Sequence, residues 1–370
     1  RTKSSAASDV YKRQPQSQLL ERNIALFDEG QWAFINPSDA YFLDGLKSQE
    51  VTVIHQYFDI FSECVRVVPS VSFDSRDITR TGFEVTQKVG NHTHIFTPFV
   101  ALEKSHTDVM IFLPKAKTHF QMLLRMAASM VGQNGRIHVV GENKGGIKSA
   151  AKLMDQYGPT QKVDSARHCS LITVLVEEPH LAFEPDAWLD MNTYHVEGTA
   201  WQVASMPGVF SYKELDAGTE LLLEKLSTSL SGEILDFACG AGVIASYIML
   251  KYPHLKLHLT DVSALAVYCS ALTLADNGLS ATLYAADGLH GFTQKVQHIV
   301  TNPPFHTGIK TDYTITKRFI SDAKASLSRG GTMQMVANRF LPYPGLLAEH
   351  FQTVYTTAQT SQFSVYQAAL

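Results

Sequence analysis

The chain has 370 residues, which is enough for two domains of ordinary size. Hydrophobic residues make up 45% of the sequence and charged residues 18%, so the composition excludes a disordered chain. The formal net charge of −4, taken as an average, argues mildly against a nucleic-acid partner. The longest apolar stretches, such as Gly242–Leu250, are shorter than the roughly 18 residues that span a bilayer, so no membrane partner is expected.

Cysteine and histidine usage argues against disulfide bonds and metal sites. The four cysteines are Cys64, Cys169, Cys239 and Cys269. Their wide spacing without a C-x-x-C pair excludes a disulfide scaffold and a zinc ribbon, and it favours a cytoplasmic protein. His92 and His94 have no suitably spaced partner residue, so we expect an ordinary loop there and no metal ion.

The first half of the sequence repeats features of the second half. Residues 1–14 are polar, begin with arginine and lack the apolar segment of a secretory signal, so we expect a leader or a non-native scar there. An apolar run then predicts a strand over Ile24–Phe27, followed by a loop without a G-x-G sequence. Three later segments, Asp108–Phe112, Gly135–Asn143 and Val163–Val176, have counterparts 190–195 residues further on, at His298–Thr301, Gly331–Asn338 and Val354–Ala369. A nearly constant offset predicts a duplicated fold.

The second half alternates between predicted strands and helices. The segment from about Glu177 to Ala187 contains two prolines and several acids and is the candidate linker, and Asn192–Val203 predicts a hairpin. The strands that follow are Glu233–Phe237, Leu255–Thr260, Ala281–Ala285, His298–Thr301 and Thr332–Ala337, and the helices between them are Val243–Lys251, Ser263–Asp276 and Ile315–Leu327. A hairpin of Val354–Thr357 and Gln362–Ala369 ends the chain. This alternation is typical of a doubly wound α/β sheet.

A glycine-rich turn, Asp236-Phe-Ala-Cys-Gly240-Ala-Gly242, lies between the first of these strands and its helix. Glycines let the backbone approach a ligand closely, and a helix N-terminus offers unpaired N–H groups. The turn also fits the dinucleotide pattern G-x-G-x-x-A, with Asp261 where a ribose-binding acid is expected, so a nicotinamide- or flavin-binding oxidoreductase is one alternative. Asp236 favours S-adenosylmethionine instead, because the dinucleotide fold normally has an apolar residue four positions before Gly240.

The tetrapeptide Asn302-Pro-Pro-Phe305 directly follows another strand, at the edge of the sheet where ligands bind. Two consecutive prolines make the backbone rigid and remove two N–H donors. The Asn302 amide oxygen and the Pro303 carbonyl then remain as acceptors, and Phe305 can stack on a planar group. This pattern predicts a site for a planar exocyclic amine, whose lone pair two acceptors direct at an electrophilic methyl group.

Taken together, these motifs resemble those of class I S-adenosylmethionine-dependent methyltransferases. More narrowly, they resemble the ribosomal RNA small subunit methyltransferase C family, which methylates guanine N2 in 16S rRNA. The resemblance extends from about Ser17 to Leu370. Further motifs that carry it are Arg22-Asn23, Val140–Asn143, Lys162–His168, Pro207–Ser211, Leu215–Thr219, Asp261–Ser263, Asn302–His306 and Val336–Asn338. It implies two tandem Rossmann-like domains with mostly parallel, seven-stranded sheets: a degenerate copy over residues 15–184 and a catalytic domain over residues 185–370.

The resemblance also implies a role for each motif residue. The cofactor-binding residues are expected to be Asp236, Ala238, Gly240, Gly242, Asp261 and Asp287. Asp261 is expected to bind the ribose hydroxyls and Asp287 the adenine amino group, while the turn holds the methionine part. Ala238 departs from the family pattern, which usually has glycine there.

The catalytic residues are expected to be Asn302 and Pro303, which bind the guanine N2, and Phe305, which stacks on the base. Phe210 and Asp216–Thr219 are expected to pack near the cofactor. In the first half, Phe112 takes the position of Asn302, so that domain is expected to have lost this site.

The distribution of charge along the sequence favours an RNA partner, although the average net charge does not. The segment Lys115–His168 contains nine basic and three acidic residues, a net charge of +6. The implied partner is 16S rRNA in the small ribosomal subunit, bound by a monomer without a metal ion. The alternatives are a related enzyme that modifies the large subunit, the oxidoreductase, and a non-catalytic RNA-binding factor. The last two have no use for an amine-binding turn.

Overall fold

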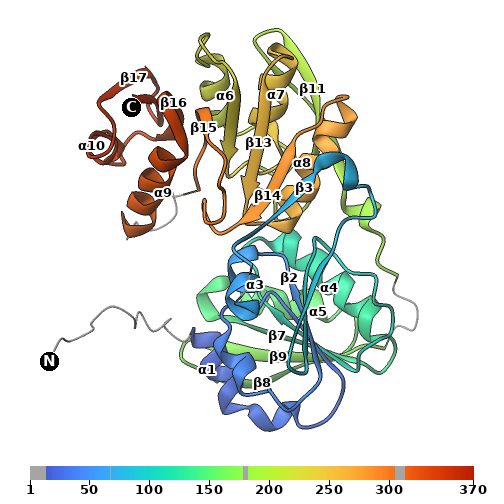
Figure 1. Cartoon of the computed structure of the whole chain (residues 1–370). Coiled ribbons are helices and arrows are strands. Elements are labelled where there is room, and N and C mark those ends of the chain that lie inside the picture. Colours follow the sequence, from blue (N-terminus) through green and yellow to red (C-terminus); the bar gives the residue numbers. More distant parts are fainter. Residues whose placement is uncertain (1–13, 67, 178–181, 305–312) are drawn as a thin grey trace, which may run out of the picture.

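The computed structural model describes residues 14–66, 68–177, 182–304 and 313–370. Two large sheets dominate this part of the chain, one in each half of the molecule, and a two-stranded hairpin lies beside the second (Figure 1). The described α-helices are α1 (Pro15–Arg22), α2 (Tyr41–Asp44), α3 (Phe58–Val65), α4 (Lys117–Val131), α5 (Ile147–Met154), α6 (Ala217–Glu224), α7 (Val243–Lys251), α8 (Ala264–Asp276), α9 (Tyr313–Ser326) and α10 (Tyr343–Ala348). Among them, no helix is both long and apolar enough to cross a membrane.

The first sheet has eight strands. In spatial order they are β4 (Val85–Val89), β5 (His92–Phe96), β2 (Val51–His55), β1 (Trp32–Ile35), β6 (Asp108–Phe112), β7 (Arg136–Glu142), β9 (Cys169–Leu175) and β8 (Thr160–Ala166). The five strands from β5 to β7 are parallel, and the strands at both ends are antiparallel to their neighbours. The inner strands are almost entirely buried, as strands covered on both faces are.

The second sheet also has eight strands. In spatial order they are β17 (Thr353–Gln359), β18 (Phe363–Ala369), β16 (Leu327–Asn338), β15 (Val296–Thr301), β12 (Glu233–Phe237), β13 (Lys256–Asp261), β14 (Thr282–Ala286) and β3 (Ser70–Asp74). Seven of these belong to the second half of the chain, as predicted. The eighth, β3, comes from the first half and pairs antiparallel with β14, with Phe73 opposite Leu283 (Figure 1).

The two sheets have the same strand order and the same strand directions, which confirms the predicted α/β fold class with two mostly parallel sheets. The predicted number of strands, seven in each sheet, was wrong, because an antiparallel strand at one edge makes eight. In each, five parallel strands are followed by an antiparallel pair at one edge, and a single antiparallel strand closes the other edge. β3 occupies in the second sheet the place that β4 occupies in the first. The predicted boundary at residues 184 and 185 remains a prediction, and β3 lies outside the sheet of its own half.

Three local predictions were wrong. Ile24–Phe27 is a 3-10 helix rather than a strand, because Leu26 and Asp28 donate backbone hydrogen bonds to residues three positions earlier. The first strand is therefore β1, which also has no G-x-G sequence after it. His92 and His94 lie on β5 rather than in a loop, and both are buried. Gly330 and Gly331, expected between a helix and a strand, lie inside β16.

The hairpin of β10 (Asp190–Val196) and β11 (Thr199–Ser205) is antiparallel, as predicted. The other strands and helices that were predicted in the second half begin and end within about two residues of their predicted bounds, apart from the early start of β16, whereas α6 and α10 were not predicted. Ser263 caps α8 as predicted, because its side chain accepts a hydrogen bond from the N–H of Ala266.

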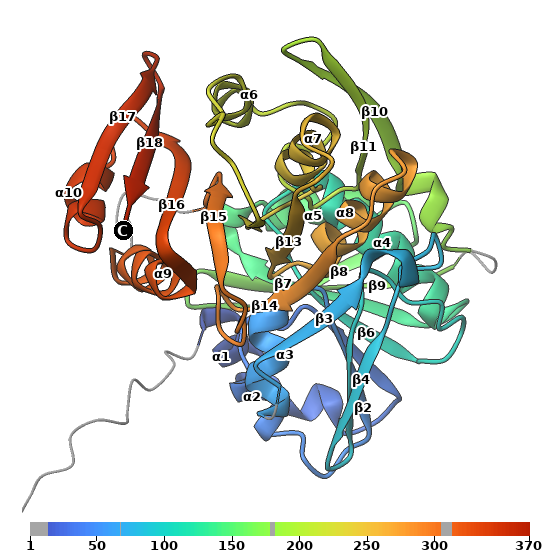
Figure 2. The ribbon, with the colours of Figure 1, turned by 45° about the horizontal axis from the view of Figure 1, so that its top comes forward.

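The two halves share one continuous hydrophobic core, and Figure 2 shows α3 and β14 adjacent where they meet. Phe99 of the first half packs edge-to-face on Tyr268 of α8, with ring centroids 5.2 Å apart. The backbone of Gly208 also lies close to the side chain of His119: Gly208 has a φ of +99°, and a Cβ atom there would lie 2.8 Å from the His119 ring. A side chain at position 208 would therefore push the halves apart.

His119 makes the stability of this junction depend on pH. Its ring is buried and bonds Gln56 Oε1 at 2.8 Å through Nε2, and burial lowers the pKa of His119 to about 4. An unfolded histidine has a pKa of about 6.5, so the unfolded chain takes up this proton first on acidification. We expect the free energy of unfolding to fall by about 2 kcal/mol from pH 7.5 to pH 5 through this group alone.

The measurement is urea unfolding at pH 7.5, 6 and 5, in wild type and in His119→Asn. The variant should lose less stability over this pH range than wild type. Equal losses in the two proteins would contradict the assignment to His119.

Candidate active site

A cavity of about 540 Å³ opens at the carboxyl ends of β12, β13, β14 and β15. Parallel strands all end at this edge, so the loops after them are brought together around one space. Six of the predicted site residues line the cavity: Ala238, Gly240, Asp261, Asp287, Asn302 and Pro303. Asp236 and Gly242 do not line it. Phe305 and His306 lie outside the described residues.

The glycine turn is shaped by left-handed backbone conformations. Ala238, Gly240 and Gly242 have φ values of +54°, +54° and +74°. A Cβ atom on Gly240 would meet nothing within 4 Å, whereas one on Gly242 would lie 3.2 Å from the Cα of Ser270 on α8. Gly240 therefore keeps space open on the cavity side, and Gly242 permits close packing of the turn on α8.

Asp236 lies beneath the turn rather than in the cavity. Its side chain is fully buried, and Oδ2 accepts a hydrogen bond from the N–H of Ala245 in the first turn of α7 at 3.0 Å. Oδ1 is buried and has no hydrogen-bond partner among the residues that the structure describes. Burial raises the pKa of Asp236 well above its ordinary range, and the nearby carboxylate of Asp261 adds to the rise. This arrangement suits a residue that holds the turn on α7.

Asp261 connects two loops at the floor of the cavity. Its Oδ2 accepts from the N–H of Gly240 at 2.9 Å, and its Oδ1 accepts from the N–H of Ser263 at 2.9 Å. Burial raises the pKa of this carboxyl, and those two N–H groups oppose the rise. Each carboxylate oxygen has a second lone pair. The group can therefore hold the turn in place and still accept hydrogen bonds from a ligand.

Asn302 is held by residues before the turn in the sequence. Its Nδ2 donates to Asp216 Oδ2 and to Thr219 Oγ1, each at 2.9 Å. The same Asp216 oxygen caps α6 by accepting from the N–H of Thr219 at 2.8 Å. These two bonds take up both amide hydrogens, so they fix which way the Asn302 amide faces. Asp216 and Thr219 line a small pocket together with Ala238 and Gly240, which agrees with their expected place near the turn, and their contact with Asn302 was not predicted.

Phe210 lies beside the turn, in the loop between β11 and α6. It lines the cavity while 60% of its surface remains exposed, an unusual state for a phenylalanine. The loop is anchored to β10, since Tyr212 donates to Asp190 at 2.7 Å and Lys213 pairs with the same carboxylate at 3.2 Å. Phe210 is therefore available to contact a planar ligand at the cavity mouth.

Comparison with known proteins agrees with this geometry. Residues 200–367 match the model of the methyltransferase small domain, and residues 75–192 match the model of its N-terminal domain. A ribosomal RNA small subunit methyltransferase C from Alteromonas mediterranea is 91% identical over 96% of this chain and 99% of its own length. The chain belongs to the ribosomal RNA small subunit methyltransferase C family. A family member from Pseudoalteromonas atlantica is 41% identical over 95% of this chain and 97% of its own length.

A solved structure supports the tandem fold. The 16S rRNA N2 guanine-1207 methyltransferase of T. thermophilus, in complex with AdoMet and guanosine, superposes with a TM-score of 0.81. The match covers 97% of this chain and 92% of that chain at 21% identity. The predicted family is thus confirmed, and the oxidoreductase alternative is set aside.

Some residues that line the cavity were missed by the sequence analysis. They are Asp59 from the first half and Arg318 and Asp322 from α9. No motif marks them. Arg318 and Asp322 are one helical turn apart and pair at 3.7 Å, so a helical periodicity could have grouped those two. Asp59 lies in the first half of the chain, far from the glycine turn in the sequence. Only the packing of the two halves brings it to the cavity.

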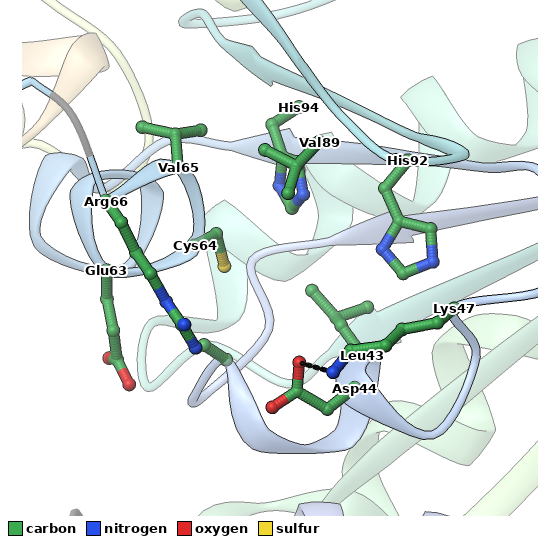
Figure 3. A pocket seen from close by; sticks show the side chains of 12 residues that line it. Leu43, Asp44, Lys47, Glu63, Cys64, Val65, Arg66, Val89, His92 and His94 are labelled. Carbon is green, nitrogen blue, oxygen red and sulfur yellow. Dashed lines mark ion pairs between the residues drawn. The ribbon is translucent and has the colours of Figure 1, made fainter.

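A second cavity, of about 290 Å³, lies in the first half, and the side chains of Cys64, His92 and His94 point toward it (Figure 3). His55, Cys64 and His94 place possible metal-ligand atoms within 4.8 Å of one another. Sequence spacing did not reveal this group, because its members come from β2, α3 and β5. His55 Nε2 and His94 Nδ1 hydrogen-bond to each other at 2.9 Å, so each ring has a partner within the protein.

Ala238 provides a test of strain in the turn, because it adopts a left-handed conformation with a φ of +54°. A left-handed alanine costs about 1–2 kcal/mol, while glycine costs roughly 0.5–1 kcal/mol in the unfolded chain. Ala238→Gly is therefore expected to raise the free energy of unfolding by up to about 1 kcal/mol. The measurement is urea unfolding of both proteins. A loss of stability would show that the Ala238 methyl group contributes packing that outweighs its backbone strain.

Proposed function

We propose that the chain transfers a methyl group from S-adenosylmethionine to the exocyclic N2 of a guanine in 16S rRNA. The observation that carries this proposal is the placement of Asn302 and Pro303 on the same cavity as Gly240 and Asp261. The proposed amine-binding turn at Asn302 and the proposed cofactor-binding turn at Gly240 then line the same cavity. Membership of the family gives the substrate.

The cavity fits S-adenosylmethionine. The open space above Gly240 accommodates a ligand close to the backbone, and Asp261 and Asp287 offer acceptors to the donors of an adenosine. We assign the ribose hydroxyls to Asp261 and the adenine amino group to Asp287. When bound, S-adenosylmethionine supplies an electrophilic methyl group. Asp236 does not touch the cofactor in this proposal. It holds the turn against the start of α7 by accepting the hydrogen bond from the N–H of Ala245.

Asn302 and Pro303 orient the amine. An exocyclic guanine amine is a poor nucleophile, because its lone pair is delocalised into the ring. The amide oxygen of Asn302 and the carbonyl of Pro303 accept the two N–H groups, which favours a pyramidal nitrogen and directs its lone pair into the cavity. Asp216 and Thr219 hold the amide in the required orientation. No strong base is needed, since the methylated nitrogen is acidic and loses its proton readily.

The base must leave its helix to reach this cavity, because N2 of a paired guanine is stacked and hydrogen-bonded. Phe210 at the mouth of the cavity, together with the predicted stacking residue Phe305, would contact the extruded base. Sequestration of the base between these groups would exclude water from the amine.

The first half is proposed to contact the rRNA. Eight of its basic side chains in the segment Lys115–His168 are exposed: Lys115, Lys117, Arg136, Lys144, Lys148, Lys152, Lys162 and Arg167. The loop that contains Lys144 is tied to the turn that contains Arg167, since the N–H of Asn143 donates to the carbonyl of His168 at 2.7 Å. Basic side chains on joined loops suit a phosphate backbone. A monomer that acts in the cytoplasm without a metal ion completes this proposal, in keeping with four free cysteines.

The experiment is incubation of the purified chain with radiolabelled S-adenosylmethionine and with 30S subunits, 50S subunits or naked rRNA. Digestion to nucleosides then identifies the product. We expect label in N2-methylguanosine from the 30S subunits. Label in 50S subunits alone would support the large-subunit alternative, and no label in any substrate would contradict the proposal.

A further inference from the structure

The first half of the chain is joined by backbone hydrogen bonds to the floor of the cofactor cavity. The N–H of Phe58 donates to the carbonyl of Val262, and the N–H of Ala264 donates to the carbonyl of Gln56, each at 2.8 Å. Tyr57 and Ser263 form an antiparallel bridge between these two bonds. Val262 and Ser263 directly follow Asp261. The start of α3 is therefore fixed against the loop that carries the ribose-binding acid.

Asp59 is the second residue of α3, and its side chain lines the same cavity as Asp261 and Asp287. In both ribbon views α3 lies near the end of β14, the strand that Asp287 follows (Figures 1 and 2). The Asp59 carboxylate accepts one hydrogen bond from its neighbour, from the N–H of Ile60 at 2.9 Å. The remaining lone pairs of this carboxylate are available to a ligand.

Asp59 and Asp287 come from opposite halves of the chain and line the same cavity. Desolvation by the cavity walls raises the pKa of Asp59, although the residue keeps an exposed surface, and the negative charge of Asp287 adds to the rise. An acid in the first turn of a helix is ordinary, because the helix dipole favours it there. A second carboxylate on the same cavity is not ordinary, since the two negative charges repel. A ligand that places hydrogen-bond donors between them would relieve this repulsion.

The adenine amino group is such a ligand. It carries two hydrogens on one nitrogen, and Asp287 can accept only one of them in good geometry. We propose that Asp59 is a further cofactor-binding residue, whose carboxylate accepts the second hydrogen of the adenine amino group. This inference rests on the proposed function, because it takes the cavity to be the S-adenosylmethionine site. The first half, which lacks a glycine turn, would then still contribute to cofactor binding.

Two carboxylates at this position would also select the purine. An amino group donates to both, whereas the carbonyl of a hypoxanthine base presents an acceptor to two acceptors and is repelled. Replacing Asp59 by asparagine changes this preference without changing the shape of the side chain. The asparagine amide can donate to a carbonyl, so the variant should gain affinity for the wrong base while losing it for the right one.

The test uses the full chain and two ligands, S-adenosylhomocysteine and S-inosylhomocysteine, which differ at the purine 6-position. Titration calorimetry measures both dissociation constants in wild type and in Asp59→Asn. We expect about 10-fold weaker binding of S-adenosylhomocysteine and tighter binding of S-inosylhomocysteine in the variant. The gain for S-inosylhomocysteine cannot arise from misfolding. Equal weakening of both ligands, or no change in either, would overturn the proposal.

The matched control is Glu63→Gln, one helical turn further along α3. Glu63 lines the second cavity of Figure 3 rather than the cofactor cavity. The Glu63→Gln variant should therefore bind both ligands with the same dissociation constants as wild type. Methyl transfer to 30S subunits distinguishes the two proposals. If wild type is active and Asp59→Asn binds both ligands as wild type does, the Asp59 proposal fails alone. If wild type methylates no rRNA but the ligand preference still reverses in Asp59→Asn, the proposed function fails alone.

Discussion

Asn302→Ala is expected to lower the rate of methyl transfer to 30S subunits by about 100-fold or more. In the proposed mechanism the amide oxygen is one of two acceptors that orient the target amine, and loss of a well-placed polar group of this kind costs about 2.7–4 kcal/mol in the transition state. The cofactor cavity keeps Gly240, Asp261 and Asp287. Affinity for S-adenosylmethionine should therefore stay within about twofold of wild type, since no cofactor contact is removed.

Rates at saturating S-adenosylmethionine, together with calorimetric dissociation constants, separate these two effects. Asn192→Ala is the control, because Asn192 bonds Ser205 on the β10–β11 hairpin and does not line the cavity. Asn302→Asp is a second variant that keeps the acceptor oxygen but brings a negative charge against Asp216. It should also be inactive at neutral pH. Full activity of Asn302→Ala on 30S subunits would show that this mechanism is wrong.

The sequence predicted the second sheet and most of its site well, because both depend on local signals. Buried parallel strands appear as short apolar runs, and the predicted site residues lie at their carboxyl ends, as Asp261 ends β13 and Asn302 follows β15. The cap of α8 at Ser263 is likewise a local feature. The duplication was also predictable, since similar segments recur at a nearly constant offset of 190–195 residues along the chain.

Contacts between distant segments could not be predicted. β3 pairs with β14 although more than 200 residues separate them, and the sequence of Ser70–Asp74 does not indicate which strand it pairs with. Asp59 reaches the cofactor cavity only because Gln56–Phe58 pairs with Val262–Ala264. The role of Asp216 was also missed: it was expected to pack near the cofactor, but its bond to Asn302 depends on how the start of α6 lies against the end of β15. These features follow from tertiary packing, which overrides local patterns.

Asp261→Ala is expected to weaken binding of S-adenosylmethionine by about 100-fold or more. Hydrogen bonds to a charged acceptor contribute roughly 1.5–3 kcal/mol each, and the variant would lose those to the ribose hydroxyls. It would also release the N–H of Gly240, which Asp261 Oδ2 holds at 2.9 Å, so the turn would no longer be preorganised. The unpaired N–H groups of Gly240 and Ser263 should lower the free energy of unfolding by about 1–3 kcal/mol.

Calorimetry with S-adenosylmethionine and urea unfolding of the same preparations measure both effects. Asp276→Ala is the control, because Asp276 is exposed at the other end of α8 and away from the cavity. Asp261→Asn separates charge from shape, since its one acceptor oxygen can serve either Gly240 or Ser263 but not both. The Asp261→Asn variant should bind S-adenosylmethionine with intermediate affinity.

The affinity of wild type should also depend on pH, because burial raises the pKa of Asp261. On acidification, this affinity should fall at a higher pH than it would for an exposed aspartate, and the asparagine variant should not show this decline. An alanine variant that binds S-adenosylmethionine as tightly as wild type would mean that the ribose is held elsewhere, and the assignment of the turn would then have to change with it.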